Sequence, residues 1–464
     1  MRGALLVGLI ALSGCTVGPN YKRPQIAMPA EFRGAPPAAA GAASVADSKW
    51  QDLFPDPTLN RMVTAALEDN FDLRIAAEQI EEARAQLGIT RANQYPFLDL
   101  QGSLTGARQS SVGSITFIRP GTPIRATYTS VSAALSWELD LFGRLRRLTE
   151  ASRAQFLASQ EGRRAVTVAL VATVIDTYFQ LLEQDSELEI SHKTEGIARD
   201  SLKLVELRRS RGAASGLDVR QAEQLLYTAT VRSAAAERAI AQTENQLSLL
   251  QGSVPGPQAR SRKLEEIAVP AQAPPGLPAA ILERRPDIRV AEQNLIAANA
   301  QIGAARALYF PQFALTASAG GQSRYLLDLL TSPARVYSVA PAAILSIFHA
   351  GQIRNQVRFS EAQQRELLVT YQKTIYNAFR EVSDALIAYD RTREQLKQEE
   401  LLVNALTETV HLSTLRYQGG LDSYLQVLVA ERSLFEGQIA LAQFRLQELL
   451  AYVQVYRALG GGWQ

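Results

Sequence analysis

The sequence predicts a mostly helical membrane protein of the α+β class, in which long coiled-coil helices are joined to four β-strands. Three observations predict this class. Long stretches without proline carry apolar residues at heptad spacing, four shorter stretches alternate apolar and polar residues, and the second half of the chain repeats the first. The formal net charge is only +2 over 464 residues, which gives no dominant basic surface for nucleic acid.

The segment before Cys15, residues 1–14, has the layout of a secretory signal. Arg2 precedes a short apolar stretch, residues 4–12, which is too brief to span a bilayer as a stable helix. The tripeptide Leu-Ser-Gly then leads to Cys15, the only cysteine of the chain. This order resembles a lipobox, at which lipoprotein signal peptidase cuts before a cysteine that becomes acylated. It predicts an exported chain that is anchored in a membrane by lipid on Cys15.

The rest of the chain divides into a tether, two repeats and a connector. Residues 15–49 are rich in proline, alanine and glycine, and we expect an extended tether with little packing of its own. The repeats are expected over residues 50–253 and 280–464. A proline-rich connector, residues 254–279, separates them.

The duplication is visible as recurring short motifs. Gly88 and Gly303 lie in similar segments, and Gly143 and Gly351 lie in a second pair of similar segments further along. Two Gly-Leu-Asp triplets, which end at Asp218 and Asp422, form a third pair. The separation in residue number shrinks from each pair to the next. This decrease predicts small loop deletions in the second half. The matching triplets place Asp218 and Asp422 at equivalent positions.

Each repeat is expected to contain a helix, two strands, a long helix, a turn and a second long helix. Leucines such as Leu98 and Leu100 interleave with polar residues, which predicts strands that have one apolar and one polar face. Pro341 predicts that the last strand is irregular or partly unpaired at that point. The four strands are expected at about 97–107, 125–139, 312–320 and 336–348.

The heptad spacing predicts coiled-coil helices of unusual length. No proline interrupts the chain from Gly143 to Arg211, so at 1.5 Å per residue this helix could reach roughly 100 Å. The heptad residues are Leu368, Tyr371, Ile375, Ala378, Val382, Ala385 and Tyr389 in one helix, and Ile439, Ala442, Leu446, Leu449, Val453 and Tyr456 in another.

Four such strands cannot close a membrane barrel, because the smallest barrels use about eight. Open sheet edges are excluded from lipid, since each unsatisfied backbone group there costs several kcal/mol. Other copies of the chain must therefore complete the sheet, and a symmetric ring with a polar lumen is the simplest solution. The alternative on pattern alone is a soluble β-sandwich with a coiled-coil arm.

Four motifs in order along the chain resemble the TolC-like outer-membrane efflux family, in its lipoprotein branch of the OprM and NodT type. They are the stretches that run from Cys15 to Pro24, from Trp137 to Arg144, from Leu282 to Ile288 and from Tyr417 to Tyr424. The resemblance implies a homotrimer with a twelve-stranded β-barrel in the outer membrane of a Gram-negative bacterium and an α-helical barrel in the periplasm.

The resemblance also implies a function without bond chemistry. Such a protein is the exit duct of a tripartite efflux pump for drugs or other small molecules, gated at its periplasmic tip. It would dock to a periplasmic adaptor protein and to an inner-membrane pump, commonly of the resistance-nodulation-division class. The channel itself would need no cofactor.

The two helix-turn-helix corners, residues 211–220 and 417–426, are expected to form that periplasmic tip. Their glycines, Gly212, Gly216, Gly419 and Gly420, permit tight reversals between long helices. We expect these turns to be the places where the adaptor docks.

Asp218 and Asp422 have two compatible interpretations. Each follows a glycine-containing turn, which suits a helix N-cap. Alternatively, three symmetry copies of Asp422 would form an acidic ring that narrows the entrance, where clustered like charges raise carboxylate pKa values or recruit cations.

The second corner departs from the family pattern. Many relatives place further aspartates one and two turns beyond Asp422, whereas this chain has Gln426 followed by apolar residues. The entrance is therefore expected to be less acidic, or to be held by Tyr417, Tyr424 and pairing with arginine. The candidate arginines are Arg220 and Arg416.

Two other functional classes fit the sequence less well. The first is an enzyme. The three histidines, His192, His349 and His411, are scattered in the sequence, and it contains no metal-ligand cluster, nucleophile elbow or phosphate loop. No catalytic, cofactor or metal site is therefore predicted. A periplasmic coiled-coil scaffold lipoprotein would not require the alternating strands. A channel that serves a metal-ion pump or a secretion system would have much the same sequence pattern, and the cargo is not predicted.

Overall fold

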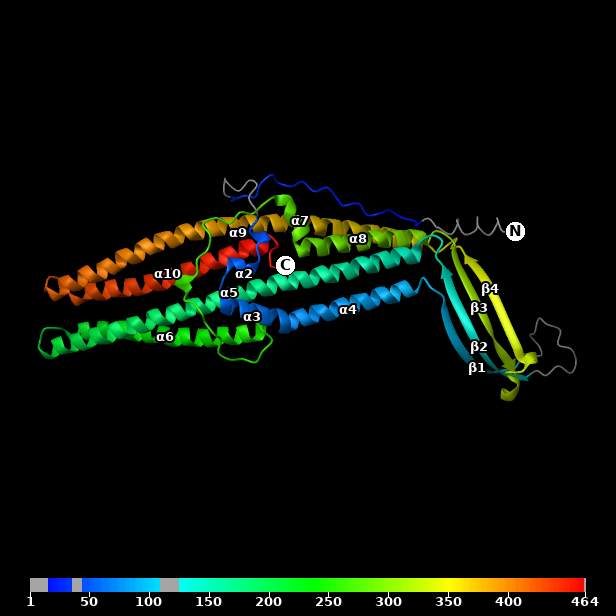
Figure 1. Cartoon of the computed structure of the whole chain (residues 1–464), viewed down its shortest axis with the longest axis horizontal. Helices are drawn as coiled ribbons and strands as arrows, with labels where there is room; N and C mark the ends of the chain where they lie inside the picture. The colour runs from blue at the N-terminus through cyan, green and yellow to red at the C-terminus, as the bar shows by residue number, and fades with distance from the viewer. Residues whose placement is uncertain (1–15, 36–43, 109–124, 463–464) are drawn as a thin grey trace. The chain divides into compact units, whose positions relative to one another are not determined.

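The computed structural model describes residues 16–35, 44–108 and 125–462 (Figure 1). The predicted signal segment and the predicted lipidation site at Cys15 lie outside these residues. The chain divides into two units. Unit 1 comprises Met1–Pro24, Ile80–Ala158 and Ala291–Tyr371, and unit 2 comprises Gln25–Gln79, Ser159–Val290 and Gln372–Gln464.

The order of elements follows the predicted repeat. Helices α2 and α3 precede the first repeat of helix, strand pair and long hairpin, and the short helix α7 precedes the second. The bounds are α2 Trp50–Leu53, α3 Pro57–Asp69, α4 Phe71–Ala92, β1 Phe97–Arg108, β2 Arg125–Leu139, α5 Arg144–Ser210, α6 Gly216–Leu250, α7 Ile281–Arg284, α8 Pro286–Ala307, β3 Gln312–Ser323, β4 Arg335–Ile344, α9 Gln352–Gln418 and α10 Tyr424–Ala458.

The two repeats differ in spacing at one place. α4 and α8 start as far apart in the chain as β1 and β3 do, whereas α5 and α9 start closer together. The second repeat is therefore shortened between its first strand and its long helix. α6 and α10 keep the separation of α5 and α9, and the long helices match in length, at 67 and 35 residues. The further deletion predicted from the Gly-Leu-Asp triplets is thus wrong.

The heptad prediction is confirmed by burial. On α9, six of the seven predicted heptad residues are buried, from Tyr371 to Tyr389, and only Leu368 is not. Among the described residues, α5 is the one helix that is long and apolar enough to cross a membrane by length and composition. Most of its apolar stretch, 61%, is buried within the chain, so packing in the helical core accounts for it.

Unit 1 contains one antiparallel sheet with strand order β1-β2-β3-β4. The register places Leu98 opposite Leu135, and Leu100 in one row with Ala133, Ala319 and Tyr337. Because residues opposite one another lie on the same face, these rows form one apolar face. The residues that share it are Leu98, Leu100, Leu104, Val131, Ala133, Leu135, Trp137, Phe313, Leu315, Ala317, Ala319, Tyr337 and Val339.

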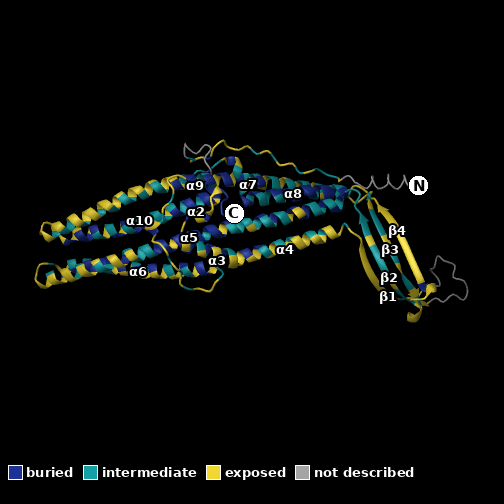
Figure 2. Cartoon of the chain, in the orientation of Figure 1, coloured by how far each residue is buried: buried dark blue, intermediate teal, exposed yellow. Residues whose placement is uncertain are grey.

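The other face of the sheet is polar. Hydroxyl pairs join neighbouring strands across it, with Ser103 and Ser130 at 2.8 Å and Ser318 and Ser338 also at 2.8 Å. The apolar face is open within the chain, since Leu100 is 79% exposed and Tyr337 86%. Figure 2 shows β4 in the colour of exposed residues. The predicted division into an apolar and a polar face is confirmed.

The last strand differs from its prediction. β4 runs from Arg335 to Ile344 and stays in register through Pro341, which is paired with Leu315. It therefore ends before the expected boundary at residue 348 and is regular at the proline. β4 is an edge strand in this chain, and an edge strand accommodates a proline whose nitrogen needs no ladder hydrogen bond.

The N-terminal segment packs more closely than the predicted tether. Within unit 1, a Cβ atom on Gly18 would lie 2.4 Å from the Cα atom of Gly303. Arg147 is only 3% exposed, and its guanidinium donates to the carbonyl oxygens of Val17 and Gly18, at 3.3 Å each, and to the Asn20 side chain at 2.8 Å. The prediction of little packing is wrong here, because small residues allow contact and a buried arginine binds the exposed carbonyl groups.

Unit 2 has a core of aromatic side chains and satisfied charges. Phe54 contacts Phe179 and Tyr452 with ring centroids 5.2 and 5.8 Å apart. Arg285 is buried and pairs with Asp287 and Glu381, each at 2.7 Å. α8 begins directly after it, at Pro286, as expected for a proline at the first helical position.

Candidate functional site: the tips of the two helical hairpins

The first hairpin turns between Ser210, the last residue of α5, and Gly216, the first residue of α6. Gly212 lies in the turn with φ at 76°, a conformation that glycine adopts without strain. The Ser215 hydroxyl accepts the N–H of Asp218, and the Asp218 carboxylate accepts the N–H of Ser215 at 2.7 Å. Asp218 is therefore part of a capping box at the start of α6.

The second hairpin turns between Gln418, which ends α9, and Tyr424, which begins α10. Gly420 has φ at 75°. Two N–H groups of Arg416 donate to the carboxylate of Asp422, at 2.5 and 3.2 Å. This bidentate pair holds the pKa of Asp422 below its usual range. The predicted pairing of an arginine with Asp422 is thus present within one chain.

The two aspartates do not occupy equivalent positions. When the helix ends serve as reference, Gly212 corresponds to Gly420, because each is the second residue after the end of its long helix. Asp218, the third residue of α6, then corresponds to Gln426 of α10, while Asp422 lies before α10 begins. The predicted equivalence is wrong. The same triplet starts a helix in the first corner and forms the turn itself in the second.

The other predicted turn residues divide by their local role. Gly216 and Gly419 have no positive φ, and the N–H of Gly419 continues the helical pattern by donating to Leu415 at 3.0 Å. Only the glycines with positive φ are required by the turns. Arg220 pairs with Glu223 at 2.7 Å, so its guanidinium is engaged within α6 and not with either corner aspartate.

An arginine that the sequence analysis did not single out links the two corners. The Arg208 guanidinium of α5 lies 4.5 Å from the centroid of the Tyr417 ring of α9. That ring is 5.5 Å from the ring of Tyr424. Burial raises the pKa of Tyr424 to about 12. Arg208 and Arg416 lie equally far from the ends of α5 and α9. This equivalence in the repeat is the sequence signal that could have identified Arg208.

An apolar cluster lies beneath these contacts and joins the first hairpin to the second. Partly buried Leu202, Leu226 and Tyr417 pack against it. Any movement that separates the two corners must break this cluster and the cation–π contact. The buried residues of the cluster are Ala198 and Val205 of α5, Val219, Ala222 and Leu225 of α6, and Tyr424, Val427 and Leu428 of α10.

A carboxylate lies on the packed stripe of α10. Glu431 falls between Leu428 and Phe435 at heptad spacing, and both neighbours are buried. One of its oxygens is buried and has no hydrogen-bond partner among the described residues. Burial raises the pKa of Glu431 to about 7. A glutamate at a heptad core position was the sequence signal, and it was missed.

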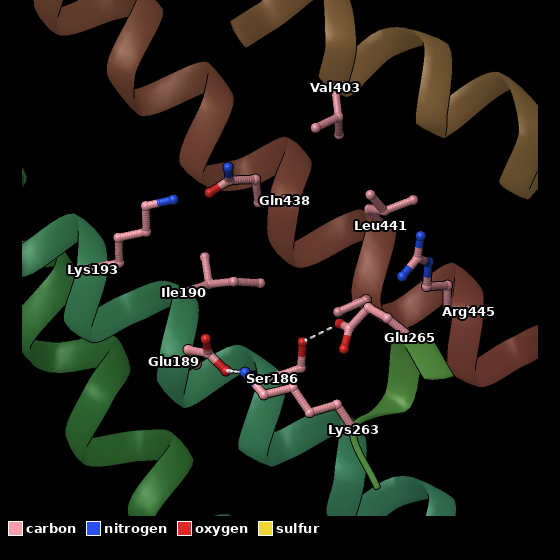
Figure 3. A pocket seen from close by; sticks show the side chains of 11 residues that line it. Ser186, Glu189, Ile190, Lys193, Lys263, Glu265, Val403, Gln438, Leu441 and Arg445 are labelled. Carbon is pink, nitrogen blue, oxygen red and sulfur yellow. Dashed lines mark hydrogen bonds and ion pairs between the residues drawn. The ribbon is translucent and has the colours of Figure 1, made fainter. Parts of the chain in front are cut away.

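A cavity of about 330 Å³ lies further along unit 2 (Figure 3). α5 and α10 contribute side chains such as Ile190 and Leu441, and charged residues come from the connector. Lys263 pairs with Glu189 at 2.6 Å, and Ser186 donates to Glu265 at 2.9 Å. These charges compensate one another, which is typical of a solvated joint between helices. In the described part of the chain, no group of three His, Cys, Asp or Glu side chains is placed to hold a metal ion.

Comparison with known proteins places this geometry in a family. The profile described as outer membrane efflux protein matches residues 62–253 and 277–461. The solvent efflux pump outer membrane protein SrpC of Pseudomonas putida is 40% identical over 99% of this chain and 97% of its own length. The cation efflux system protein CusC of Escherichia coli is 35% identical over 98% of this chain and 97% of its own length.

The fold is similar to that of solved outer-membrane channels. The structure of the outer-membrane channel OprN has a TM-score of 0.88 and 28% identity, and the match covers 97% of this chain and 100% of that one. The profile, the curated relatives and the solved channel all cover most of the chain. The chain therefore belongs to the outer membrane efflux protein family.

Proposed function

We propose that this chain is one of three identical subunits of the outer-membrane exit channel of a tripartite efflux pump. As a member of an efflux family it is a passive conduit and not an enzyme. The observation that carries the proposal is the exposed apolar face of the sheet. Leu98, Leu100 and Leu104 all lie open on that face, which suits contact with lipid.

The number of strands supports a ring of several copies. Within one chain, β1 and β4 are the two edges of the sheet. Three copies that pair β4 of one with β1 of the next would close a barrel of twelve strands and leave no open edge. The serine-lined face would then line an aqueous lumen.

The hairpin tips are proposed as the periplasmic gate and adaptor-docking surface. The turns around Gly212 and Gly420 are short and held by caps and ion pairs, so they present fixed shapes to a partner. The Arg416–Asp422 pair and the Arg208–Tyr417 contact are proposed to hold the tip closed. An adaptor and an inner-membrane pump of the resistance-nodulation-division class are the proposed partners.

Small organic molecules are the proposed cargo, because SrpC is named as part of a solvent efflux pump. CusC is named for cation efflux, and a cation is therefore the second candidate. We also propose that lipid on Cys15 anchors the channel in the outer membrane.

The test of the channel uses the purified, lipid-bearing protein. Mass measurement in detergent is expected to give three copies per particle, and insertion into planar bilayers is expected to give small, discrete conductance steps. A particle of one copy that stays soluble without detergent would refute the proposal.

The test of cargo uses a deletion strain. Loss of the protein is expected to increase sensitivity to organic solvents and lipophilic drugs, and reintroduction of the gene is expected to restore growth. Sensitivity to copper or silver alone would favour the cation.

A further inference from the structure

A cleft lies on the apolar face of the sheet in unit 1. It has a volume of about 830 Å³, which is within the range of about 300–1,000 Å³ that is usual for ligand pockets. The sheet forms its floor, and the segment between β3 and β4 forms its wall. Its lining includes Leu100, Val131, Ala319, Leu329, Tyr337 and Arg335.

The wall of the cleft is a folded segment that crosses the sheet closely. A Cβ atom on Gly321 would lie 2.2 Å from the carbonyl oxygen of Leu329, so only glycine allows this approach. Two short helical turns, Leu326–Asp328 and Ser332–Ala334, shape the segment. Ala334 is buried beneath it. The cleft is therefore a built feature of the fold.

The wall segment carries several large apolar side chains that are exposed within the chain. Leu327 and Leu330 are each 94% exposed, and Leu326 and Tyr325 are also exposed. A segment surrounded by water would lose the hydrophobic free energy of burying these leucines. Since the segment projects from the face that we assign to lipid, the leucines fit among acyl chains.

The cleft also carries positive charge. Arg335 lines it at the first position of β4, and Arg324 lies exposed at the other end of the wall segment. Neither arginine has an acidic partner among the described residues. From Gln312 to Ile344 the only acidic residue in the sequence is Asp328. An arginine beside an apolar cleft matches a phosphate that is attached to acyl chains.

We propose that this cleft binds a phosphate-bearing lipid of the outer leaflet. One acyl chain lies against Leu100, Val131 and Leu329, and the lipid phosphate binds Arg335. The inference rests on the proposed function, in which the apolar face contacts lipid. A second copy of the chain is the less suitable occupant, because ring closure would pair the backbone edges of β1 and β4, whereas the cleft lies on the apolar face of the sheet and is lined by residues of all four strands.

The test compares two probes that differ only in phosphate. Lipid A with its phosphates and enzymatically dephosphorylated lipid A are titrated into the delipidated trimer, and lipid binding is followed by native mass spectrometry. The parent protein is expected to bind the phosphate-bearing form more tightly.

Charge and volume are tested with separate variants. Arg335→Gln is expected to weaken binding of the phosphate-bearing form about fivefold, since a basic residue near an anionic lipid surface contributes about 1 kcal/mol, and to leave binding of the other form unchanged. Arg335→Lys is expected to keep the preference. Ala319→Phe fills the cleft and is expected to weaken binding of both forms.

The control is Arg354→Gln, which removes an exposed arginine from α9 in the same unit and is expected to leave both affinities unchanged. The proposal is overturned if Arg335→Gln keeps the parent's preference for phosphate, or if Ala319→Phe binds both lipids as well as the parent does. Conductance and particle mass are measured on the same samples. A trimeric, conducting parent without lipid preference defeats this inference alone, whereas a parent that forms no channel defeats the proposed function.

Discussion

At the scale of single residues, the corner of the second hairpin combines charge with turn geometry. Asp422 is bound by two N–H groups of Arg416 in its own chain. Since this hydrogen-bonded pair lowers the pKa of Asp422, the carboxylate stays ionised at neutral pH. An acidic ring at the entrance would therefore be partly neutralised by its own arginines.

Removing this pair is expected to loosen the gate. Asp422→Ala and Arg416→Ala should each raise the conductance of the channel in planar bilayers, and the double variant should raise it no further, because the two residues act through one contact. Arg220→Ala is the matched control, since Arg220 pairs with Glu223, and its conductance should equal that of the parent. An Asp422→Ala channel no leakier than the parent would remove this residue from the gate.

Glu431 is expected to make stability depend on pH. Burial raises its folded-state pKa to about 7 from an ordinary value of 4.5. The folded chain thus binds more protons than the unfolded chain between these values, so the free energy of unfolding falls as pH rises from about 4.5 to about 7 and is level above that range.

Glu431→Gln should abolish this loss, so that the free energy of unfolding rises by about 3 kcal/mol at pH 8 and is unchanged near pH 4.5. Thermal unfolding at the two pH values measures it. Glu436→Gln is the control, because Glu436 is exposed and pairs with Arg432 on the same helix. Equal stability of Glu431→Gln and the parent at pH 8 would show that the carboxyl group is solvated.

At the scale of elements, α6 and α10, the shorter helices of the two hairpins, begin in different ways. Ser215 caps α6 through its side chain, whereas Ser423, at the corresponding place before α10, makes no side-chain cap hydrogen bond. Ser215→Ala should therefore destabilise the first turn of α6 by about 1 kcal/mol.

Hydrogen exchange measures this difference directly. Amides in the first turn of α6 should exchange about fivefold faster in Ser215→Ala, which corresponds to that loss of free energy. Ser423→Ala should change nothing at α10. Faster exchange in both variants, or in neither, would contradict the assignment of the caps.

The N-terminal segment of unit 1 is an element held by backbone contact. Gly18 has φ at 101° and lies against Gly303. Gly18→Ala should release the segment, because the new Cβ is strained in that conformation and overlaps the backbone of Gly303. Trypsin should then cleave after Lys22 about tenfold faster, since the strain alone is about 1–2 kcal/mol.

The control for this variant is Gly102→Ala, where an added Cβ atom meets nothing within 4 Å. It should leave cleavage unchanged. An unchanged rate in Gly18→Ala would mean that the segment is held chiefly by Arg147 and the other side chains that bind it.

At the scale of the whole molecule, the sheet edges decide assembly. β1 and β4 each have one edge without a partner in the chain, and their polar faces carry Gln101 and Ser338. Cysteines introduced at these two positions, or at neighbours of the same face, should form disulfides between copies and give covalent trimers in intact cells.

Ser132 and Thr316 supply the matched control, because they lie on the two central strands of the same sheet. Cysteines there should give no bond between copies. If cysteines on the edge strands formed no disulfide between copies in any register, or if those on the central strands gave the same covalent trimers, closure of the ring through β1 and β4 would be wrong.

Much of this architecture could be predicted from the sequence because it depends on periodicity. Heptad spacing fixes which side of a helix is buried. On α9, the predicted heptad residues from Tyr371 to Tyr389 are buried as expected. Alternation fixes the face of each strand residue, so Leu98 and Leu100 lie together on the apolar face. Prolines and glycines mark the ends of elements, as at Pro286 and Gly212.

Other features depend on which elements meet, and these became visible only in the folded chain. Long helices, a two-faced sheet and a duplicated chain can be inferred from the residue pattern, because they follow from local repeats along one strand or helix. The same pattern does not contain the contact between Arg208 and Tyr417 or the cleft beside Arg335. Both arise where residues distant in the chain are brought together, and pairing across such distances is not encoded in the period of any one segment.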